Sequence, residues 1–348
     1  MSQQIILSHD IAADLGRLCG DAYDKVFVLA DERTARLCLP RLDACAPLAA
    51  AGRIVVGATD THKTLDTLAA VWSALVAGGA TRHSLLVCLG GGMVTDLGGF
   101  AAATFKRGIA FVNVPTTLLA MVDAAVGGKT GINFEGLKNE IGAFCESRAV
   151  VIDTAFLRTL GEADFRSGYA EMLKHALIEG VAMWRAHLDF DLARPDLARL
   201  QEMVAQSIAV KSRVVAADPR EQGLRKALNL GHTVGHAFES LALERGCPVP
   251  HGYAVAWGLV GELYLSTVLR GFPADRMRAT VAFVNEYYGR PDFTCKHYGR
   301  LCELMRHDKK NAGGNVNFTL LSEVGEICLD CHADEALLRD MFDFVREG

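Results

Sequence analysis

The 348-residue sequence lacks the features that mark several large classes of protein. It has no uninterrupted apolar run of the roughly 18 residues that a membrane span needs. Residues 1–5 lack the basic start and the long apolar core of a secretory signal. A basic stripe is also absent and the formal net charge is −5, so neither nucleic acid nor an anionic membrane is an expected partner.

Cysteine pairs are scarce as well. Of ten cysteines, only Cys328 and Cys331 form a CxxC pair, and a four-cysteine zinc site would need a second pair. Scattered cysteines of this kind are typical of reduced thiols in the cytoplasm, where we expect this protein to be located.

The first part of the chain alternates between strand and helix patterns. Strands are predicted at residues 25–30, 53–56, 84–89, 109–114 and 150–153, with helices at residues 33–50, 64–77 and 93–103. This alternation is typical of a mostly parallel sheet that helices cover on both faces. We therefore predict a Rossmann-like α/β domain over residues 1–153.

Helical periods dominate the rest of the chain. Helices are predicted at residues 162–187, 197–217, 224–244, 253–269, 274–288 and 333–345, with one hairpin pairing residues 316–321 with residues 326–329. The change of pattern near residue 153 predicts a second, mostly helical domain over residues 154–348.

A glycine-rich stretch follows the apolar residues 85–89. Gly90, Gly91 and Gly92 stand where a strand ends and a helix begins, and Asp96 lies one helical turn further on. Glycine lets a backbone approach a phosphate closely, and the N–H groups of a helix start favour an anion. Hydroxyls and lysines recur behind the glycines up to residue 144, which favours a phosphate-bearing ligand over a strand–helix turn without a ligand.

Histidines and one glutamate could bind a metal ion. His232 and His236 are four residues apart, so they share one helical face, although two histidines with unrelated roles would have the same spacing. His251 stands at a predicted helix start and Glu171 within a helix, where each alone indicates little. One glutamate and two histidines form a common zinc set with an open fourth position.

A polar row precedes these histidines, namely Lys211, Asp218, Arg220, Glu221, Arg225 and Asn229. Glu221, Arg225 and Asn229 are spaced by four, with His232 three residues later, so one helix would align them in a single stripe. Such a stripe is either a salt-bridged surface or one wall of a site, and its end at the histidines favours the site.

Several motifs occur in a fixed order along the chain. They are Gly90-Gly91-Gly92 with Asp96, Thr104 with Arg107-Gly108, Pro115-Thr116-Thr117 with Asp123, Gly127-Gly128-Lys129-Thr130, Lys138-Asn139, Gly168 with Ala170-Glu171 and Lys174, and Leu228-Asn229-Leu230-Gly231-His232-Thr233 with Gly235-His236. Together they resemble the 3-dehydroquinate synthase family of the shikimate pathway, which leads to chorismate and the aromatic amino acids. The resemblance covers nearly the whole chain.

The resemblance implies a fold and two cofactors. The fold is a parallel-sheet NAD domain followed by a mostly helical metal-binding domain, with the active site in the cleft between them. A divalent metal, zinc or cobalt, is bound by Glu171, His232 and His251. NAD is bound by Asp31, Asp60, Lys63, Gly91, Gly92, Met93, Val94, Thr95, Asp96, Thr116, Thr117, Lys129, Lys138, Phe156, Leu157, Arg158 and Thr159.

It also implies roles toward the substrate, 3-deoxy-D-arabino-heptulosonate 7-phosphate. Lys211 and Arg225 bind its carboxylate. Its phosphate is bound by Lys129, Asn139, Asn229, His236 and Lys309, with Lys310 as the alternative to Lys309. Asp123, Lys174 and Glu221 complete the catalytic set. Arg107 reaches the site of the neighbouring subunit, which implies a homodimer.

The implied reaction uses NAD catalytically. Transient oxidation allows phosphate to leave, the ketone is reduced again, and the ring opens and closes by an aldol step. Three departures from the family pattern bear on the cofactor loop, namely Thr95, Ala124-Ala125 and Gly136-Leu137. They put the geometry of that loop in question and remove no group that the chemistry needs.

Three other functions stay open at this point. Another sugar-phosphate cyclase would act on a substrate without a carboxylate, and the intact Lys211 and Arg225 disfavour it. A metal-dependent polyol dehydrogenase would share the glycine turn without needing an anion pocket. A non-catalytic nucleotide-binding regulator would be expected to have lost a metal ligand.

Overall fold

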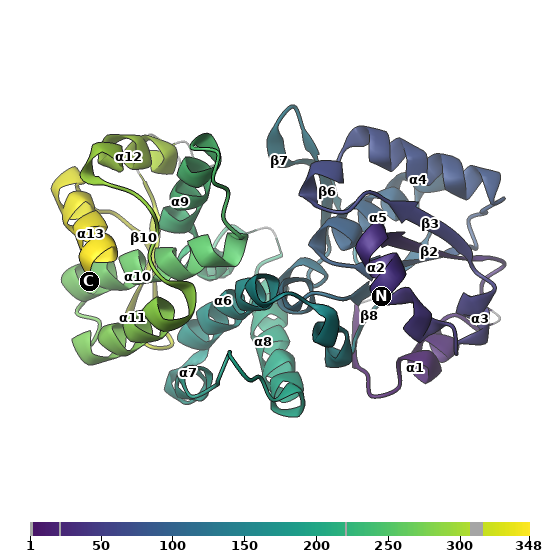
Figure 1. Ribbon diagram of the computed structural model, residues 1–348, viewed down its shortest axis with the longest axis horizontal. Coiled ribbons are helices and arrows are strands. Elements are labelled where there is room, and N and C mark those ends of the chain that lie inside the picture. The colour runs from purple at the N-terminus through teal and green to yellow at the C-terminus, as the bar shows by residue number, and fades with distance from the viewer. Residues whose placement is uncertain (1–2, 21, 220, 307–315) are drawn as a thin grey trace. The chain divides into compact units, whose positions relative to one another are not determined.

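A computed structural model describes residues 3–20, 22–219, 221–306 and 316–348. The chain divides into two compact units (Figure 1). We call Met1–Gly161 together with Leu197–Ile208 the sheet unit, and Glu162–Asp196 together with Ala209–Gly348 the helical unit. All ten cysteines are free thiols.

The sheet unit is built on six parallel strands in the order β1-β8-β5-β4-β2-β3. They are β1 (Gln4–Leu7), β2 (Val26–Asp31), β3 (Gly52–Val56), β4 (Leu85–Gly90), β5 (Ala110–Pro115) and β8 (Ala149–Ile152). β4 is buried along its whole length, which explains its continuous apolar sequence.

Helices cover both faces of this sheet (Figure 1). The helical segments are α1 (Ile11–Leu18), α2 (Glu32–Leu37), η1 (Leu39–Leu42), α3 (Ala46–Ala49), η2 (Asp60–His62), α4 (Leu65–Ala77), α5 (Gly92–Thr104), η3 (Phe105–Arg107), η4 (Ala120–Ala124) and η5 (Thr154–Thr159). α4 and α5 bury Leu68, Val71 and Leu97 in one apolar core with Leu29 and Cys88 of the strands. The predicted parallel α/β architecture is confirmed.

A hairpin that we did not predict extends from this unit. β6 (Lys129–Phe134) and β7 (Leu137–Phe144) pair antiparallel. The two loop residues, Glu135 and Gly136, have φ of 48° and 80°. Two positive φ values define the turn that matches the twist of a hairpin, and glycine suits its second position. Of the Gly136-Leu137 departure, Gly136 is thus the second turn residue and Leu137 is the first residue of β7.

The helical unit is organised around α10. Its elements are α6 (Glu162–Glu179), α7 (Val181–Leu188), the end of α8 (Leu197–Ala217), η6 (Leu224–Asn229), α9 (His232–Glu244), α10 (His251–Arg270), α11 (Ala274–Tyr288), η7 (Cys295–His297), α12 (Tyr298–Arg306), β9 (Phe318–Glu323), β10 (Glu326–Cys331) and α13 (Glu335–Glu347). α10 contacts α6, α9, α11, α13 and β9. It is long and apolar enough to cross a membrane by composition alone, but 72% of its most apolar window is buried inside the protein, as in any core helix.

Three predicted helices are interrupted. Residues 33–50 form α2, η1 and α3, because Pro40 and Pro47 each begin a new helical segment. Gly180, with φ of 149°, separates α6 from α7. Gly231, with φ of 79°, separates η6 from α9. The predicted hairpin of residues 316–329 is confirmed, whereas β1, α1 and α12 were not predicted.

Candidate functional site

Three side chains from three helices converge in the helical unit. Glu171 of α6 is fully buried, and its Oε1 atom lies 3.3 Å from His232 Nε2 and 3.6 Å from His251 Nε2. Among the residues that the structure describes, Oε1 has no hydrogen-bond partner. Tetrahedral zinc with bonds of about 2.1 Å holds its ligand atoms about 3.4 Å apart. Both distances match that spacing, as expected of ligands that share one divalent metal ion.

The second ring nitrogen of each histidine, Nδ1, also has a polar partner. His232 Nδ1 lies 3.2 Å from the carbonyl oxygen of Leu230, and His251 Nδ1 lies 2.9 Å from Glu239 Oε2. Nδ1 of each ring is engaged in these contacts, so Nε2 is the ring nitrogen that faces Glu171. Partners of this kind orient histidine ligands and increase their basicity.

Charges around Glu171 keep it ionised. Burial alone would raise the pKa of Glu171, but the Lys174 ammonium and His232 outweigh it and hold that pKa well below the usual range. Lys174 is itself buried and donates to Glu171 Oε2. Burial lowers the pKa of His251, whereas the neighbouring carboxylates of Glu171 and Glu239 raise it to about 9.

Glycines allow the three helices to approach so closely. A Cβ atom at Gly258 of α10 would overlap the carbonyl oxygen of Gly231, and one at Gly252 would overlap that of Ser167 on α6. Because backbone faces backbone at both places, only glycine fits. These two contacts position α10 against α6 and the start of α9.

His236 belongs to the same cluster. It lies one turn after His232 in α9, with ring centroids 5.3 Å from His232 and 5.8 Å from His251. Ligand atoms of the three histidines all lie within 4.8 Å of one another. The assignment of His236 to the substrate and not to the metal therefore stays a prediction.

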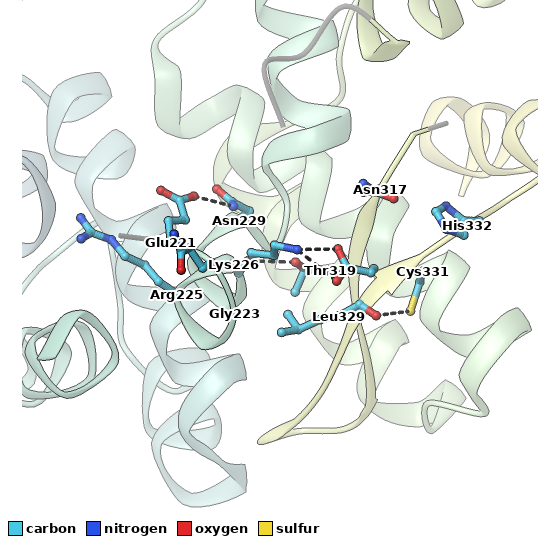
Figure 2. A network of polar contacts seen from close by, with 12 residues as sticks. Glu221, Gly223, Arg225, Lys226, Asn229, Asn317, Thr319, Leu329, Cys331 and His332 are labelled. Carbon is cyan, nitrogen blue, oxygen red and sulfur yellow. Dashed lines mark hydrogen bonds and ion pairs between the residues drawn. The ribbon is translucent and has the colours of Figure 1, made fainter. Parts of the chain in front are cut away.

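The polar row before the histidines does not form the helix that we predicted. Glu221 precedes η6 with φ of 59°, and Gly231 ends the segment, so the single helical stripe that we predicted is wrong. The Asn229 amide nevertheless donates to Glu221 Oε1 at 2.9 Å (Figure 2). Arg225 is buried and donates to the carbonyl oxygen of Pro219 at 2.8 Å, and Lys211 of α8 is also buried.

Asp218 folds the loop that carries Glu221 and Arg225. Its carboxylate accepts hydrogen bonds from the backbone N–H groups of Gln222, Gly223 and Arg225, at 3.1, 2.7 and 3.1 Å. We assigned no function to Asp218 from the sequence, and the structure shows that it stabilises this loop. An aspartate before a glycine-containing loop is a recognisable signal for such a turn.

A hydrogen bond and an ion pair connect η6 to the β9–β10 hairpin. Thr319 donates to the carbonyl oxygen of Lys226 at 2.9 Å, and the Lys226 ammonium pairs with Asp330. In Figure 2, Lys226 extends toward Thr319 while Arg225 and Glu221 lie on the other side of the segment. The predicted phosphate ligands Lys309 and Lys310 lie outside the described residues.

In the sheet unit, the glycine turn lies where the strand order diverges. The chain runs from β2 to β3 on one side of the sheet and from β4 to β5 on the other. Asp31 ends β2, Gly90 ends β4, and α5 begins at Gly92. Ligands of parallel sheets bind at such a point, beyond the carboxyl ends of the strands. The predicted nucleotide site therefore stands at the place that the topology favours.

The polar side chains near this turn differ in their hydrogen-bond partners. Thr116 is buried, and its hydroxyl has no hydrogen-bond partner among the described residues, which fits a ligand atom. The Thr117 hydroxyl accepts from Ala120 N at 3.2 Å. Asp31 Oδ1 caps α2 by accepting from Arg33 N and Thr34 N, so this carboxylate also has a structural role.

The other residues predicted to contact NAD differ in burial and lie on different elements. Met93 is half-buried and Val94 is buried, both in the first turn of α5, and Lys129 and Lys138 are exposed on the hairpin. Phe156 and Leu157 are core residues of η5, whereas Arg158 and Thr159 are exposed. Asp123 lies in η4 and is half-buried.

A buried lysine connects the glycine helix to the hairpin. Lys63 is 3% exposed, and its ammonium donates to Asp96 at 2.6 Å and also to Asn139 Oδ1. Asn133 reinforces this connection: its N–H donates to the Lys63 carbonyl at 2.8 Å, and its amide donates to Asp60 Oδ2 at 2.9 Å. Asn133 also accepts from Asn139 N at 2.9 Å. We did not single out Asn133, because its partners at residues 60 and 63 are distant in sequence.

Two departures from the family pattern fit their surroundings. The Thr95 hydroxyl donates to the Gly92 carbonyl at 3.1 Å within α5. The Ala124 methyl lies 3.2 Å from where a Cβ of Gly92 would be, so alanine packs against the glycine turn. The substitutions therefore leave that turn intact.

Arg107 stands in a strained turn at the end of α5. Lys106 and Arg107 have φ of 48° and 68°, values that L-residues rarely adopt, and Arg107 is exposed. A turn with two such residues is over-determined by its surroundings and often has a functional reason.

Comparison with known proteins identifies the family of the chain. Residues 53–167 match the family described as 3-dehydroquinate synthase N-terminal, and residues 168–311 match 3-dehydroquinate synthase C-terminal. A 3-dehydroquinate synthase of Parabacteroides distasonis is 49% identical over 347 residues, which cover 99% of this chain and 98% of that protein. The chain belongs to the 3-dehydroquinate synthase family. The resemblance stated from the motifs is thereby confirmed.

Solved structures of related enzymes share the fold. A 2-deoxy-scyllo-inosose synthase, solved with carbaglucose-6-phosphate, NAD+ and Co2+, has a TM-score of 0.83 and 23% identity, covering 99% of this chain and 96% of that chain. The 2-epi-5-epi-valiolone synthase of Streptomyces hygroscopicus, with NAD+ and Zn2+ bound, has a TM-score of 0.80 and 23% identity, covering 98% and 96%. At this identity the likeness shows the fold alone.

Proposed function

We propose that this chain converts 3-deoxy-D-arabino-heptulosonate 7-phosphate to 3-dehydroquinate and phosphate, as a phosphate-eliminating lyase of the cytoplasm. The observation that carries the proposal is the convergence of Glu171, His232 and His251 on one metal-sized space. The family of the chain gives the reaction, and the groups present supply the chemistry that this reaction needs.

Two bound groups supply chemistry that side chains cannot. NAD at the glycine turn would supply a hydride acceptor and donor, and a divalent metal held by Glu171, His232 and His251 would supply a Lewis acid for the hydroxyl that is oxidised. Glu171 stays ionised and Lys174 holds its second oxygen, so the carboxylate remains fixed for the metal. NAD would occupy the glycine turn of residues 1–153, and the metal and substrate would belong to residues 154–348.

The cationic residues bind and orient the substrate. Lys211 and Arg225 are buried, so their charges act in a low-dielectric environment and can fix a carboxylate firmly. Asn229, His236, Lys129 and Asn139 would hold the phosphate, and a cationic pocket stabilises the charge that the leaving phosphate carries. Binding energy at the remote carboxylate also helps to orient the reacting carbon.

The main test follows the phosphate and the nicotinamide together. We expect stoichiometric phosphate release with no net accumulation of NADH and a requirement for only catalytic NAD. Growth of NADH in step with substrate loss, without phosphate release, would instead identify a polyol dehydrogenase. Turnover of a sugar phosphate that lacks the carboxylate, in preference to the heptulosonate, would identify another cyclase.

A homodimer in which Arg107 completes the partner's site is part of this proposal. Its support is the strained, exposed turn at Arg107 and the apolar surface of the β6–β7 hairpin, where Leu137 is 55% and Phe144 73% exposed. These large apolar side chains would be covered by a partner subunit in the proposed dimer.

Mixed dimers test this sharing. One chain carries Arg107→Ala and the other carries Lys211→Ala, so each mixed dimer has one site with both defects and one site with neither. We expect mixing to restore activity that neither homodimer has. Verified subunit exchange without any recovery would exclude a shared site.

A further inference from the structure

Glu262 is a fully buried glutamate of α10 to which the proposed reaction assigns no role. Its Oε2 atom accepts from Gly231 N at 2.6 Å, and its Oε1 atom accepts from Thr233 N and Val234 N at 3.0 and 3.2 Å. A buried carboxylate is costly unless hydrogen bonds satisfy it, and three backbone donors do so here.

These three donors belong to the start of α9. The N-cap residue Gly231 has no side chain to bond the first N–H groups of the helix, so Glu262 performs that function from the neighbouring helix. A negative charge at a helix N-terminus is also favoured by the helix dipole. The contact therefore fixes the first turn of α9 against α10.

One of these bonds leads directly to a predicted metal ligand. Gly231 N–H and the Leu230 carbonyl are the two polar groups of a single peptide bond. Glu262 holds the N–H, and the carbonyl oxygen lies 3.2 Å from His232 Nδ1. Because the peptide is planar, fixing its N–H also fixes the direction of its carbonyl, and hydrogen bonds in series strengthen one another.

We infer that Glu262 is a positioning residue for the metal centre, acting through the Leu230–Gly231 peptide on the ring of His232. This inference rests on the proposed metal centre. The two histidine ligands would then be oriented by two carboxylates, His251 directly by Glu239 and His232 through one peptide group by Glu262. Such outer partners of metal ligands set both metal affinity and geometry.

Glu262→Gln tests the inference with little change of shape. The amide oxygen can still accept from Thr233 N and Val234 N, but the NH2 group then faces Gly231 N–H, and two donors oppose each other. We expect the Co2+ affinity, measured by chelator competition, to fall about ten-fold. The visible d–d spectrum of bound Co2+ should also shift, since the orientation of His232 changes.

Ser266→Ala is the matched control. Ser266 lies one turn further along α10 and is fully buried, and its hydroxyl donates to the Glu262 backbone carbonyl at 2.6 Å and accepts from Leu321 N at 3.0 Å. Its loss removes two buried bonds and leaves the Glu262 carboxylate on its three backbone donors. We expect this variant to lower the melting temperature of the metal-free protein but to keep the Co2+ affinity and spectrum of the wild type. Glu239→Gln, which changes the direct partner of His251, should shift both Co2+ readouts.

The outcomes distinguish the absence of a metal centre from the absence of a positioning role for Glu262. A wild-type protein that binds no Co2+ overturns the metal centre and this inference with it. A wild-type protein that binds Co2+, together with a Glu262→Gln variant whose Co2+ readouts match those of Ser266→Ala, overturns the inference alone. If Glu262→Gln does not fold, Glu262→Asp replaces it, and failure of both to fold assigns Glu262 to the fold and overturns the positioning role.

Discussion

The predicted nucleotide site and the predicted metal site are held in place by different kinds of structure. In the sheet unit, the site residues follow strand ends, where the glycine turn of residues 90–92 lies at the divergence of the strand order. In the helical unit, Glu171, His232 and His251 come from three separate helices. The first arrangement depends on a short local motif, whereas the second depends on how closely helices pack.

This difference has a physical consequence. A glycine turn after a buried strand forms wherever the sheet forms, because its backbone geometry is local. The metal ligands meet only if the α6, α9 and α10 backbones touch, and Gly252 and Gly258 allow this. The metal site should therefore be the more sensitive of the two to changes in packing, and the four predictions below test that difference.

Loss of a metal ligand should have the largest effect. We expect His232→Ala to abolish metal binding and to lower turnover at least about 100-fold, since a Lewis acid contributes several kcal/mol to the transition state. NAD binding in the sheet unit should be unchanged. Metal content by elemental analysis and NAD titration measure the two effects.

His236→Ala is the control for this prediction. It removes a histidine of the same cluster, one turn further along α9, and should leave the metal content near that of the wild type while turnover falls. A metal-free His236→Ala protein would show that our choice of ligands is wrong.

Arg225→Ala should have the next largest effect. We expect turnover to fall roughly 100-fold, the scale of losing one preorganised charge-stabilising donor, while NAD affinity changes little. Lys226→Ala is a matched control, because the neighbouring lysine pairs with Asp330 of the hairpin. Equal losses in the two variants, or a parallel loss of NAD binding, would contradict a substrate role for Arg225.

Gly258→Ala and Gly98→Ala compare the packing of the two units directly. The added methyl group at Gly258 would overlap a backbone oxygen, whereas at Gly98 it would meet the side chains of Cys88 and Leu29. Overpacking costs about 1–3 kcal/mol, and we expect Gly258→Ala to exceed this range because a backbone cannot move aside as a side chain can.

Thermal unfolding and Co2+ affinity together measure this comparison. Gly258→Ala should also weaken Co2+ binding, whereas Gly98→Ala should leave it unchanged. Similar destabilisation by both variants, with Co2+ affinity unaltered in each, would mean that helix packing does not set the metal site.

Asn133→Ala should have the smallest effect. It removes the two bonds from the Asn133 amide to Asp60 and the bond that Asn133 accepts from Asn139 N within the hairpin. Each such bond contributes about 1 kcal/mol, so we expect NAD affinity to fall about ten-fold without a change in metal content. Thr130→Val removes a bond within the hairpin, to the Ala143 carbonyl, and should weaken NAD binding less. Equal NAD affinities in both variants would remove the positioning role of Asn133.

Sequence patterns predicted the elements that are long and regular. In the sheet unit, β2, β3, β4, β5, β8, α4 and α5 were predicted to within one residue. β1 and α1 were not predicted, and Pro40 and Pro47 divide the helix predicted at residues 33–50. The hairpin of residues 129–144 escaped notice, although Glu135-Gly136 between apolar residues is a usable turn signal. The predicted helical stripe through Glu221, Arg225 and Asn229 was wrong. Gly231 has a left-handed backbone that ends the segment before α9, but the spacing of the polar residues in the sequence is the same with or without this break.

By itself, the sequence determined the family, the parallel sheet, the glycine turn and the residue types that the chemistry needs, because these depend on local order and spacing. Only the tertiary structure decided how Glu171, His232 and His251 meet, how Lys63 reaches Asp96, and that Glu262 bonds the peptide before His232. Each of these contacts joins residues that are 19 or more positions apart or lie on different elements. Their distances depend on where backbones touch, and no local spacing in a sequence encodes that.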